Sequence, residues 1–294
     1  MKVAVLGYGT VGAGVYSMLS DAPGMEAGPV IVRPGKAVES FMVSDAALIF
    51  GDPTVDAVVE TLGGLDPAYS YGMRALEAGK HFITANKVMV ASHGLELAAL
   101  AREKRAAFLF SAACGGGVPF LHNLALSAET DRIEAVSGIL NGTTNYMLDA
   151  MQRRGLSYGD ALREAQSLGY AESDPTADVS GLDALRKMQL ACAVAFGVLP
   201  QSGMLCEGME HFTAADVEDI QSRGLVCRLM ARGSRAGESV SAYVEPVLFP
   251  RAAPESSVFT NNNMASYTGK RCGSIVLMGQ GAGRFPTASA VLRD

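Results

Sequence analysis

The chain has 294 residues, of which 49% are hydrophobic and 18% are charged. Its 24 basic and 30 acidic residues give a net charge of −6, and no basic stripe runs along the sequence. We therefore do not expect a nucleic acid or an anionic membrane as partner, and small solutes are favoured. The length predicts two domains or one large α/β domain.

The first 115 residues alternate short apolar runs with helical patterns. Strands are predicted at 2–6, 30–32, 46–50, 57–61, 81–85 and 107–112, and helices at 10–19, 67–78 and 92–103. Apolar runs that are buried on both faces and joined by crossover helices are typical of a mostly parallel, doubly wound sheet. The fold class predicted for this part is therefore α/β.

The rhythm changes after CGGGVP at 114–119. Strands are predicted at 133–140, 239–249 and 273–278, a turn at 141–145, helices within 146–196 and 213–230, and loops at 233–238 and 250–257. This segregation of helices and strands predicts a second, α+β domain. The longest uncharged run, 188–206, contains Pro200 and polar residues, which favours a buried helix and a turn over a membrane span.

The cysteines and the N-terminus indicate a compartment. Five cysteines stand far apart with no CxxC pair, and MKVAVLGYG lacks the apolar region of a signal peptide. We expect a reduced, cytoplasmic protein whose cysteines are small buried hydrophobes.

A glycine-rich loop, GYGTVG, follows the first strand and opens the first helix. In a Rossmann-type dinucleotide site the first glycine allows a tight turn, the second lets the backbone approach a pyrophosphate, and the third allows close helix packing. The alternative is tight packing without a cofactor. The expected cofactor contacts here are Gly7, Gly9, Thr10, Val11 and Gly12.

The residues at the end of the second predicted strand indicate whether the cofactor is NADP or NAD. VIVRPGK offers Arg33 and Lys36 but no acid. An arginine there suits a 2′-phosphate, so NADP is predicted over NAD, although NAD remains possible. Alternatively, both are solvated loop charges.

Charge is concentrated in ESDPTADVSGLDALRKMQL, which begins at Glu172. A helix start explains Asp174 as a cap and accounts for Asp178 near the positive end of the helix dipole. It does not explain Lys187, which lies one turn after Asp183 at the edge of a strongly apolar helix.

Five stretches point to one family: GYGTVGAGV, TANKVMVASHG, GILNGTTNYML, ESDPTADVSGLDALRK and GQGAGRFPTASAV. In these words and this order the chain resembles homoserine dehydrogenase, which interconverts L-homoserine and L-aspartate 4-semialdehyde with NAD(P), towards threonine and methionine. The resemblance implies a discontinuous dinucleotide-binding domain, 1–122 plus 277–294, with Gly283 of the last motif among its cofactor-binding residues. Residues 123–276 would bind substrate and form a homodimer.

The resemblance also implies roles for the charged residues. Lys187 matches the family's acid/base lysine, Asp183 its catalytic aspartate, and Glu172 and Asp178 carboxylates of the substrate site. Lys87 matches a lysine between cofactor and substrate. Lysines and carboxylates suit an oxidation of homoserine. The hydroxyl proton must leave when the hydride leaves, which requires a base, and the substrate ammonium group requires carboxylates to bind it. Burial or a second cation would help Lys187 lose its proton, whereas Asp183 would hold it charged.

The chain departs from the family at SAACGGGVP. There the carbonyls of Cys114, Gly116 and Val118 match those that hold a monovalent cation such as sodium, but Ser111 replaces the family glutamate. A neutral hydroxyl should weaken such a site, so cation binding is doubtful. The alternative is that the glycines only form a turn. The chain also stops at Asp294, where many relatives carry a regulatory domain, so feedback control through one is not expected.

Two rival functions stay open. One is another amino-acid dehydrogenase, against which the SGLDALRK helix argues. The other is a non-catalytic NADP-binding regulator, against which Lys87, Glu172, Asp183 and Lys187 argue together. The histidines are scattered without metal-ligand spacing.

Overall fold

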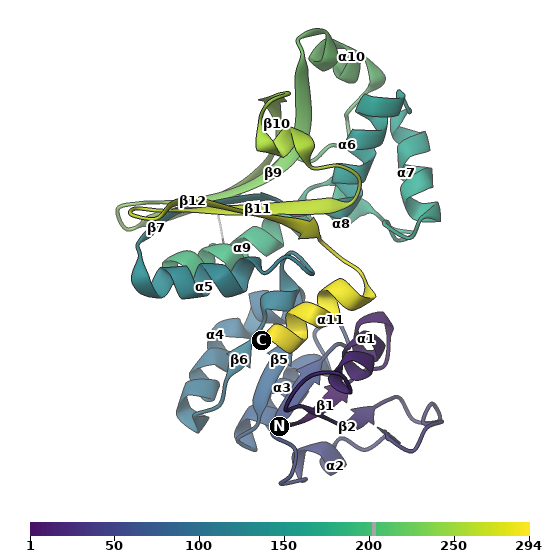
Figure 1. The fold of residues 1–294 in the computed structure, drawn as a ribbon, viewed down its shortest axis with the longest axis vertical. Coiled ribbons are helices and arrows are strands. Elements are labelled where there is room, and N and C mark those ends of the chain that lie inside the picture. Colours follow the sequence, from purple (N-terminus) through teal and green to yellow (C-terminus); the bar gives the residue numbers. More distant parts are fainter. Residues whose placement is uncertain (202–203) are drawn as a thin grey trace. The chain divides into compact units, whose positions relative to one another are not determined.

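The chain forms two compact units (Figure 1). The computed structural model describes residues 1–201 and 204–294. Met1–Gly117 and Ala282–Asp294 make the first unit, and Val118–Gly281 make the second. The first unit is thus built from two separate segments of chain, with the changes of unit at Gly117 and Gly281 rather than near 122 and 277.

The first unit contains a six-stranded parallel sheet. Its order is β3-β2-β1-β4-β5-β6, and every neighbouring pair is parallel. The strands are β1 (Lys2–Leu6), β2 (Glu26–Ile31), β3 (Met42–Val43), β4 (Ala57–Glu60), β5 (His81–Thr84) and β6 (Phe108–Leu109). This order is that of a doubly wound dinucleotide-binding sheet, which confirms the predicted fold class.

Helices cover both faces of this sheet. Val3 and Val5 of β1 pack with α1 (Thr10–Leu19) and α11 (Arg284–Arg293), whereas Ala4 and Leu6 pack with α2 (Ala47–Phe50), α3 (Ala68–Glu77) and α4 (Lys87–Lys104). Alternate residues of one strand therefore belong to two cores, which is why its sequence is apolar throughout.

Three predictions for this unit were wrong in detail. The strand predicted at 107–112 is limited to Phe108–Leu109, and residues 111–113 form a 3₁₀ turn. Residues 46–50, predicted as a strand, form α2, whose Ile49 and Phe50 are buried; periodicity alone does not separate a short apolar strand from a helical turn. The helix predicted at 92–103 begins at Lys87, because the Asn86 side chain accepts a hydrogen bond from Met89 N and caps it.

The second unit is built on a mixed sheet in the order β12-β11-β7-β9-β10-β8. All of its pairs are antiparallel except β8 with β10. The strands are β7 (Ile133–Ile139), β8 (Leu205–Cys206), β9 (Leu225–Ala236), β10 (Ser239–Pro250), β11 (Asn262–Gly269) and β12 (Gly273–Gln280). The predicted α+β character of this part is confirmed.

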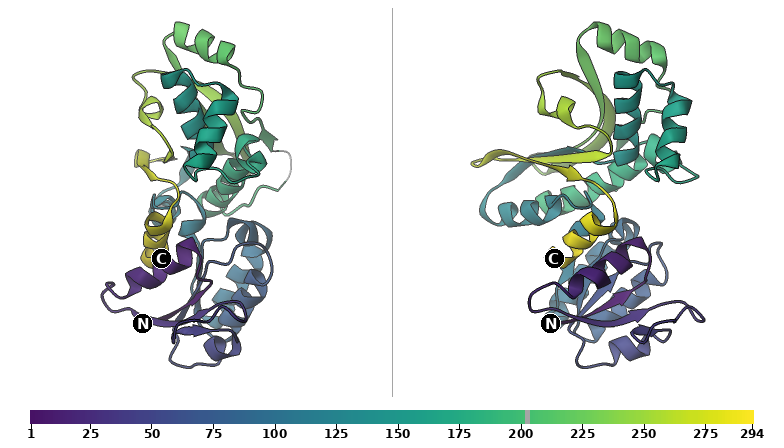
Figure 2. Two further views of the ribbon diagram at one scale, coloured as in Figure 1. Left: turned by 90° about the vertical axis from the view of Figure 1, so that its right-hand side faces the viewer. Right: turned by 45° about the vertical axis from the view of Figure 1, so that its right-hand side comes forward.

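One face of this sheet carries α5 (Phe120–Thr130) and α9 (Leu182–Phe196) (Figures 1 and 2). The remaining helices are α6 (Gly142–Arg154), α7 (Tyr158–Ser167), α8 (Thr176–Val179) and α10 (Ala214–Ser222), with the 3₁₀ turns η1 (Ser111–Ala113) in the first unit and η2 (Pro254–Ser257) here. On the face of the sheet away from α5 and α9, the Ser137 and Ser266 hydroxyls lie 2.7 Å apart, and Val276 and Met278 are exposed.

The second unit differs from the expectations at β9 and β11. The helix predicted to run to residue 230 ends at Ser222, and 225–230 open β9, which also takes up most of the loop predicted at 233–238. Strand β11 has no predicted counterpart, because its Asn, Ser and Thr residues obscure the alternation. In the run 188–206, α9 ends at Phe196; positions 202 and 203 of the expected turn lie outside the described residues.

Among the helices of the described residues, none has the length and apolar character that crossing a membrane requires. Within the described residues, no disulfide joins any of the five cysteines. Cys114, Cys192 and Cys227 are buried as expected, whereas Cys206 is half-buried and Cys272 is exposed.

Candidate active site

A large cavity lies in the first unit at the carboxyl ends of β1, β2 and β4. It measures about 1060 Å³ and is lined in part by Gly7 and Gly9, by Arg33 and Lys36, and by residues 61–63. The strand order reverses direction beside β1, and open α/β sheets bind ligands at such a point. The volume suits a molecule of dinucleotide size.

The three glycines of the loop differ in what a side chain would meet. Gly7 has a φ of +99°, which favours glycine, and a Cβ on Gly12 would lie 2.1 Å from the Gly7 carbonyl oxygen. A Cβ on Gly9 would meet no atom within 4 Å, so the backbone there is open to a ligand. Thr10, Val11 and Gly12 form the first turn of α1, and Gly283 (φ +117°) is the N-cap of α11.

Arg33 and Lys36 are exposed and line this cavity, as a cofactor role requires. The cavity also contains a carboxylate that sequence reasoning missed, Glu39, because it stands beyond the RPGK turn. Tyr8 and Phe41 line it too, and the Phe41 ring stacks on Tyr16 with centroids 4.2 Å apart. Positively and negatively charged side chains therefore both line the part of the cavity where the ribose of a dinucleotide is expected to bind.

A buried carboxylate, Glu60, connects the cavity to the helix that carries Lys87. Its Oε1 accepts hydrogen bonds from the amides of Leu62 (2.6 Å) and Gly63 (3.1 Å), and its Oε2 accepts one from the Thr84 hydroxyl (2.5 Å). Thr84 Oγ1 in turn accepts from the amide of Asn86, the N-cap of α4. Half-buried Lys87 is the first residue of α4, so this network fixes its position.

The second unit brings Lys187, Asp183 and Asp178 together around Asn141. Lys187 Nζ lies 2.7 Å from Asp183 Oδ2 and donates to the Leu140 carbonyl at 2.7 Å. Asn141 Nδ2 donates both to Asp178 Oδ1 (2.7 Å) and to Asp183 Oδ2 (2.9 Å). Only 13% of the Lys187 side chain and 8% of the Asp183 side chain are exposed. The i,i+4 pair noted in the sequence is therefore a nearly buried ion pair.

Burial raises the pKa of Asp178, and the negative charge of Asp183 adds to this effect. The hydrogen bond from Asn141 and the charge of Lys187 act in the opposite direction. Glu172 differs from the others: it is exposed, and in the described residues no hydrogen bond or ion pair joins its carboxylate to the cluster. The structure thus assembles three of the four predicted charged residues of this unit.

Asn141 is the residue of this cluster whose contacts with the carboxylates were not predicted from the sequence. Its Oδ1 caps α6 by accepting from the Thr144 amide (2.8 Å), which confirms the cap expected for NGTTN, whereas residues 142–145, predicted as a turn, begin the helix. The same side chain also donates to two carboxylates, and only its burial beside them, which a single sequence does not show, reveals this second role.

We expect Asn141→Ala to shift the pH dependence of turnover as well as lower stability. Loss of the cap should cost about 1 kcal/mol. Loss of the donor removes an interaction that favours ionised Asp178, so its pKa should rise further and the acidic limb of the pH–rate profile should move to higher pH. The matched control is Ser157→Ala, which removes the N-cap of α7. If both variants gave the wild-type profile, Asn141 would be a cap only.

The predicted cation ligands are split between the two units. Cys114 and Gly116 belong to the first, where Gly116 has a φ of +54°, and Val118 begins the second. Ser111 opens η1, and its amide donates to Asp294 Oδ2 at 2.8 Å. The described residues contain no group of three or more His, Cys, Asp or Glu side chains that could hold a metal ion.

Comparison with known proteins assigns both halves of the chain. The family model for homoserine dehydrogenase matches residues 119–294, and the model for the NAD-binding domain of homoserine dehydrogenase matches 7–111. The chain belongs to the homoserine dehydrogenase family. The homoserine dehydrogenase of Corynebacterium glutamicum is 38% identical over 313 residues, covering 99% of this chain and 70% of that protein.

Two further members of the family are similar over the whole chain. The homoserine dehydrogenase of Synechocystis is 38% identical over 318 residues, covering 100% of this chain and 72% of its own. The crystal structure of a homoserine dehydrogenase from Thiobacillus denitrificans has a TM-score of 0.92 at 36% identity, with 100% of this chain and 72% of that chain covered. The resemblance inferred from five motifs is confirmed, and with it an NAD(P)-linked oxidoreduction of homoserine.

Proposed function

We propose that the chain oxidises L-homoserine to L-aspartate 4-semialdehyde, and catalyses the reverse reaction, with Lys187 moving the hydroxyl proton. The observation that carries this assignment is the nearly buried Lys187–Asp183 pair, with its 2.7 Å contact. A buried pair costs desolvation energy, and folding alone gives no reason to keep it on an apolar helix. Turnover of L-homoserine by wild-type protein and by Lys187→Ala tests the proposal.

The charged residues that we assign to the substrate site in the second unit have distinct roles in this mechanism. The Leu140 carbonyl and Asp183 fix Lys187 Nζ at two points, so its position is set before substrate arrives. Asp178 is half-buried and supplies a carboxylate for the substrate ammonium. Glu172, being exposed, would contribute a second carboxylate only through a movement of its loop.

The residues of the first unit fit a bound nicotinamide dinucleotide. Gly7 and Gly9 offer backbone to the pyrophosphate at the start of α1, and Glu60 holds the adjoining loop through the amides of Leu62 and Gly63. When bound, the nicotinamide supplies the hydride acceptor. Asn86 places Lys87 at the start of α4, and we assign Lys87, like Arg33 and Lys36, to the cofactor-binding residues of this unit.

NADP should be preferred over NAD, and Arg33 and Glu39 should set the preference in opposite directions. Arg33→Ala removes a charge-assisted contact to a 2′-phosphate and should lower the NADP/NAD ratio of kcat/KM about tenfold. Glu39→Gln removes a repelling carboxylate from the same cavity and should raise the ratio. Steady-state kinetics with both cofactors measure this. An unchanged ratio in Arg33→Ala would exclude Arg33 from cofactor choice.

Activity should depend little on sodium or potassium, and Ser111→Glu should create or strengthen such a dependence. The carbonyls of Cys114, Gly116 and Val118 are neutral dipoles, whereas an added carboxylate brings a full opposing charge to a cation. Turnover of both proteins is measured in choline chloride while each alkali chloride is added. Steep, saturable activation of the unmodified protein would show that the serine has not weakened the site.

We also propose that the protein is a cytoplasmic homodimer formed through the second unit. Its sheet has exposed apolar side chains on β12, Val276 (49% exposed) and Met278 (56%), on the face away from α5 and α9. Pairing with a second copy would cover them. Sedimentation velocity of Met278→Arg against wild type tests this face.

A further inference from the structure

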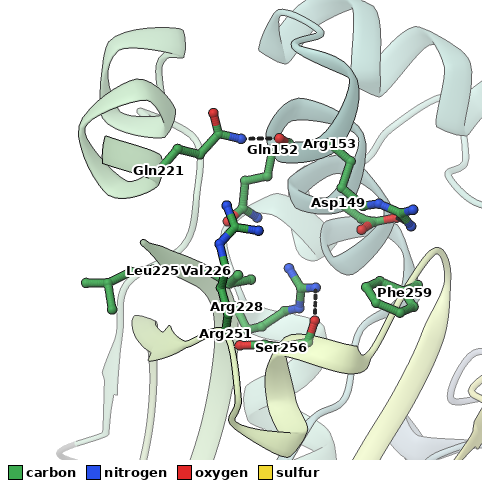
Figure 3. Close-up of a pocket in the computed structure, with 10 residues that line it drawn as sticks. All are labelled: Asp149, Gln152, Arg153, Gln221, Leu225, Val226, Arg228, Arg251, Ser256 and Phe259. Carbon is green, nitrogen blue, oxygen red and sulfur yellow. Dashed lines mark hydrogen bonds and ion pairs between the residues drawn. The ribbon is translucent and has the colours of Figure 1, made fainter. Parts of the chain in front are cut away.

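A second pocket lies wholly within the second unit, between the C-terminal part of α6, the start of β9 and the segment that follows β10 (Figure 3). Its volume is about 260 Å³. The side chains that decide its chemistry are Asp149, Arg153, Arg228, Arg251 and Phe259. None of these has a part in the mechanism above.

The base of this pocket contains a buried positive charge. Arg228 is 1% exposed, and its guanidinium donates to three backbone carbonyls: Cys227 at 2.9 Å, Glu255 at 3.3 Å and Ser256 at 3.3 Å. These bonds fix the position of the guanidinium but do not neutralise its positive charge. In the part of the chain that is described, no carboxylate lies within ion-pair distance of it. Burial lowers the pKa of Arg228, and the nearby negative charge of Asp149 opposes this shift without cancelling it. A charge in such a place is stabilised by an anion.

The rim adds positive charge. Arg153 is held over the Phe259 ring, 4.7 Å from its centroid, and Arg251 is an exposed residue of the lining. The carboxylate of Asp149 already accepts from the Thr260 amide at 3.2 Å and lies 3.9 Å from Arg153. Three guanidinium groups thus face one carboxylate, and the pocket keeps a net positive charge.

We propose that this pocket binds a small organic anion whose carboxylate or phosphate group pairs with the guanidinium groups of Arg228, Arg251 and Arg153. Planar guanidinium groups match both oxyanions through paired hydrogen bonds. Leu225, Val226 and Phe259 supply apolar surface for the remainder of the ligand. The volume limits that remainder to a few carbon atoms.

The test is calorimetric titration of the full chain with inorganic phosphate and, separately, with malonate, at constant ionic strength. Saturating NADP is present, so that anion contacts in the nucleotide cavity are already made. We expect saturable binding of at least one probe at one site per chain. Binding of phosphate alone would identify a phosphate-bearing ligand, and binding of malonate alone a carboxylate.

Two exposed arginines give a matched comparison that does not disturb the buried Arg228. Arg251→Ala should weaken binding at least tenfold, about 1.4 kcal/mol, whereas Arg271→Ala, between β11 and β12, should bind like wild type. Arg153→Ala should weaken it in the same way. The proposal is overturned if neither probe binds saturably, or if Arg251→Ala and Arg271→Ala bind equally well.

Discussion

Replacing Lys187 with alanine should reduce kcat by at least a thousandfold while the protein still binds NADP(H). Proton transfer by a positioned side chain contributes about 10²–10⁴-fold to a rate, and Lys187 also orders the cluster through Asp183 and the Leu140 carbonyl. The cofactor cavity belongs to the first unit, so its affinity should change by less than about twofold. Stopped assays measure kcat, and cofactor titration measures binding.

Arg223→Ala is the matched control for this substitution. Arg223 forms an i,i+4 pair with Asp219, as Lys187 does with Asp183, but its side chain is 61% exposed. An exposed pair contributes about 0–1 kcal/mol to stability, and turnover should not change. If Lys187→Ala kept activity within about tenfold of wild type, roughly 1.4 kcal/mol of barrier, the acid/base role would be wrong.

Asp183→Asn should lower kcat about a hundredfold with little change in fold. The amide keeps the shape of the side chain and can still accept from Asn141, but it removes the negative charge that lies 2.7 Å from Lys187 Nζ. Lys187 would then be a buried cation with one charged partner fewer, and its protonation and position would both change. The pH–rate profile should therefore shift together with the loss of kcat.

The control here is Asp219→Asn, which neutralises the carboxylate of the exposed pair. Thermal unfolding of both variants separates stability from catalysis. Asp183 would not be a catalytic residue if Asp219→Asn lost as much kcat as Asp183→Asn. The same conclusion would follow if Asp183→Asn had the kcat and the pH–rate profile of wild type.

The sequence predicted the first unit more accurately than the second. Its strands are apolar on both faces and its glycine loop has a fixed place, so β1 and α1 could be assigned almost to the residue. The error at 46–50 arose because four or five apolar residues fit a strand or a helical turn equally well. In the second unit, β11 pairs with β7 far earlier in the chain, and the start of β9 pairs with the end of β10; local patterns reveal neither pairing.

The candidate site was predictable where spacing on one helix defines it. Asp183 and Lys187 are four residues apart on α9, and this spacing alone places them together. Asn141 and Glu60 were missed for a common reason. Each is a polar residue whose importance comes from burial against distant groups, Asp178 for one and Thr84 for the other. Glu172, which the resemblance suggested, has no such contact among the described residues.

The most direct measurement is reduction of the nicotinamide by purified wild-type protein with L-homoserine, followed by absorbance, with NADP and NAD in parallel. We predict turnover that requires L-homoserine, is faster with NADP, and is lost in Lys187→Ala while Arg223→Ala remains active. A folded protein that binds NADP but does not reduce it with L-homoserine would contradict the proposed function. It would instead support a non-catalytic nucleotide-binding role.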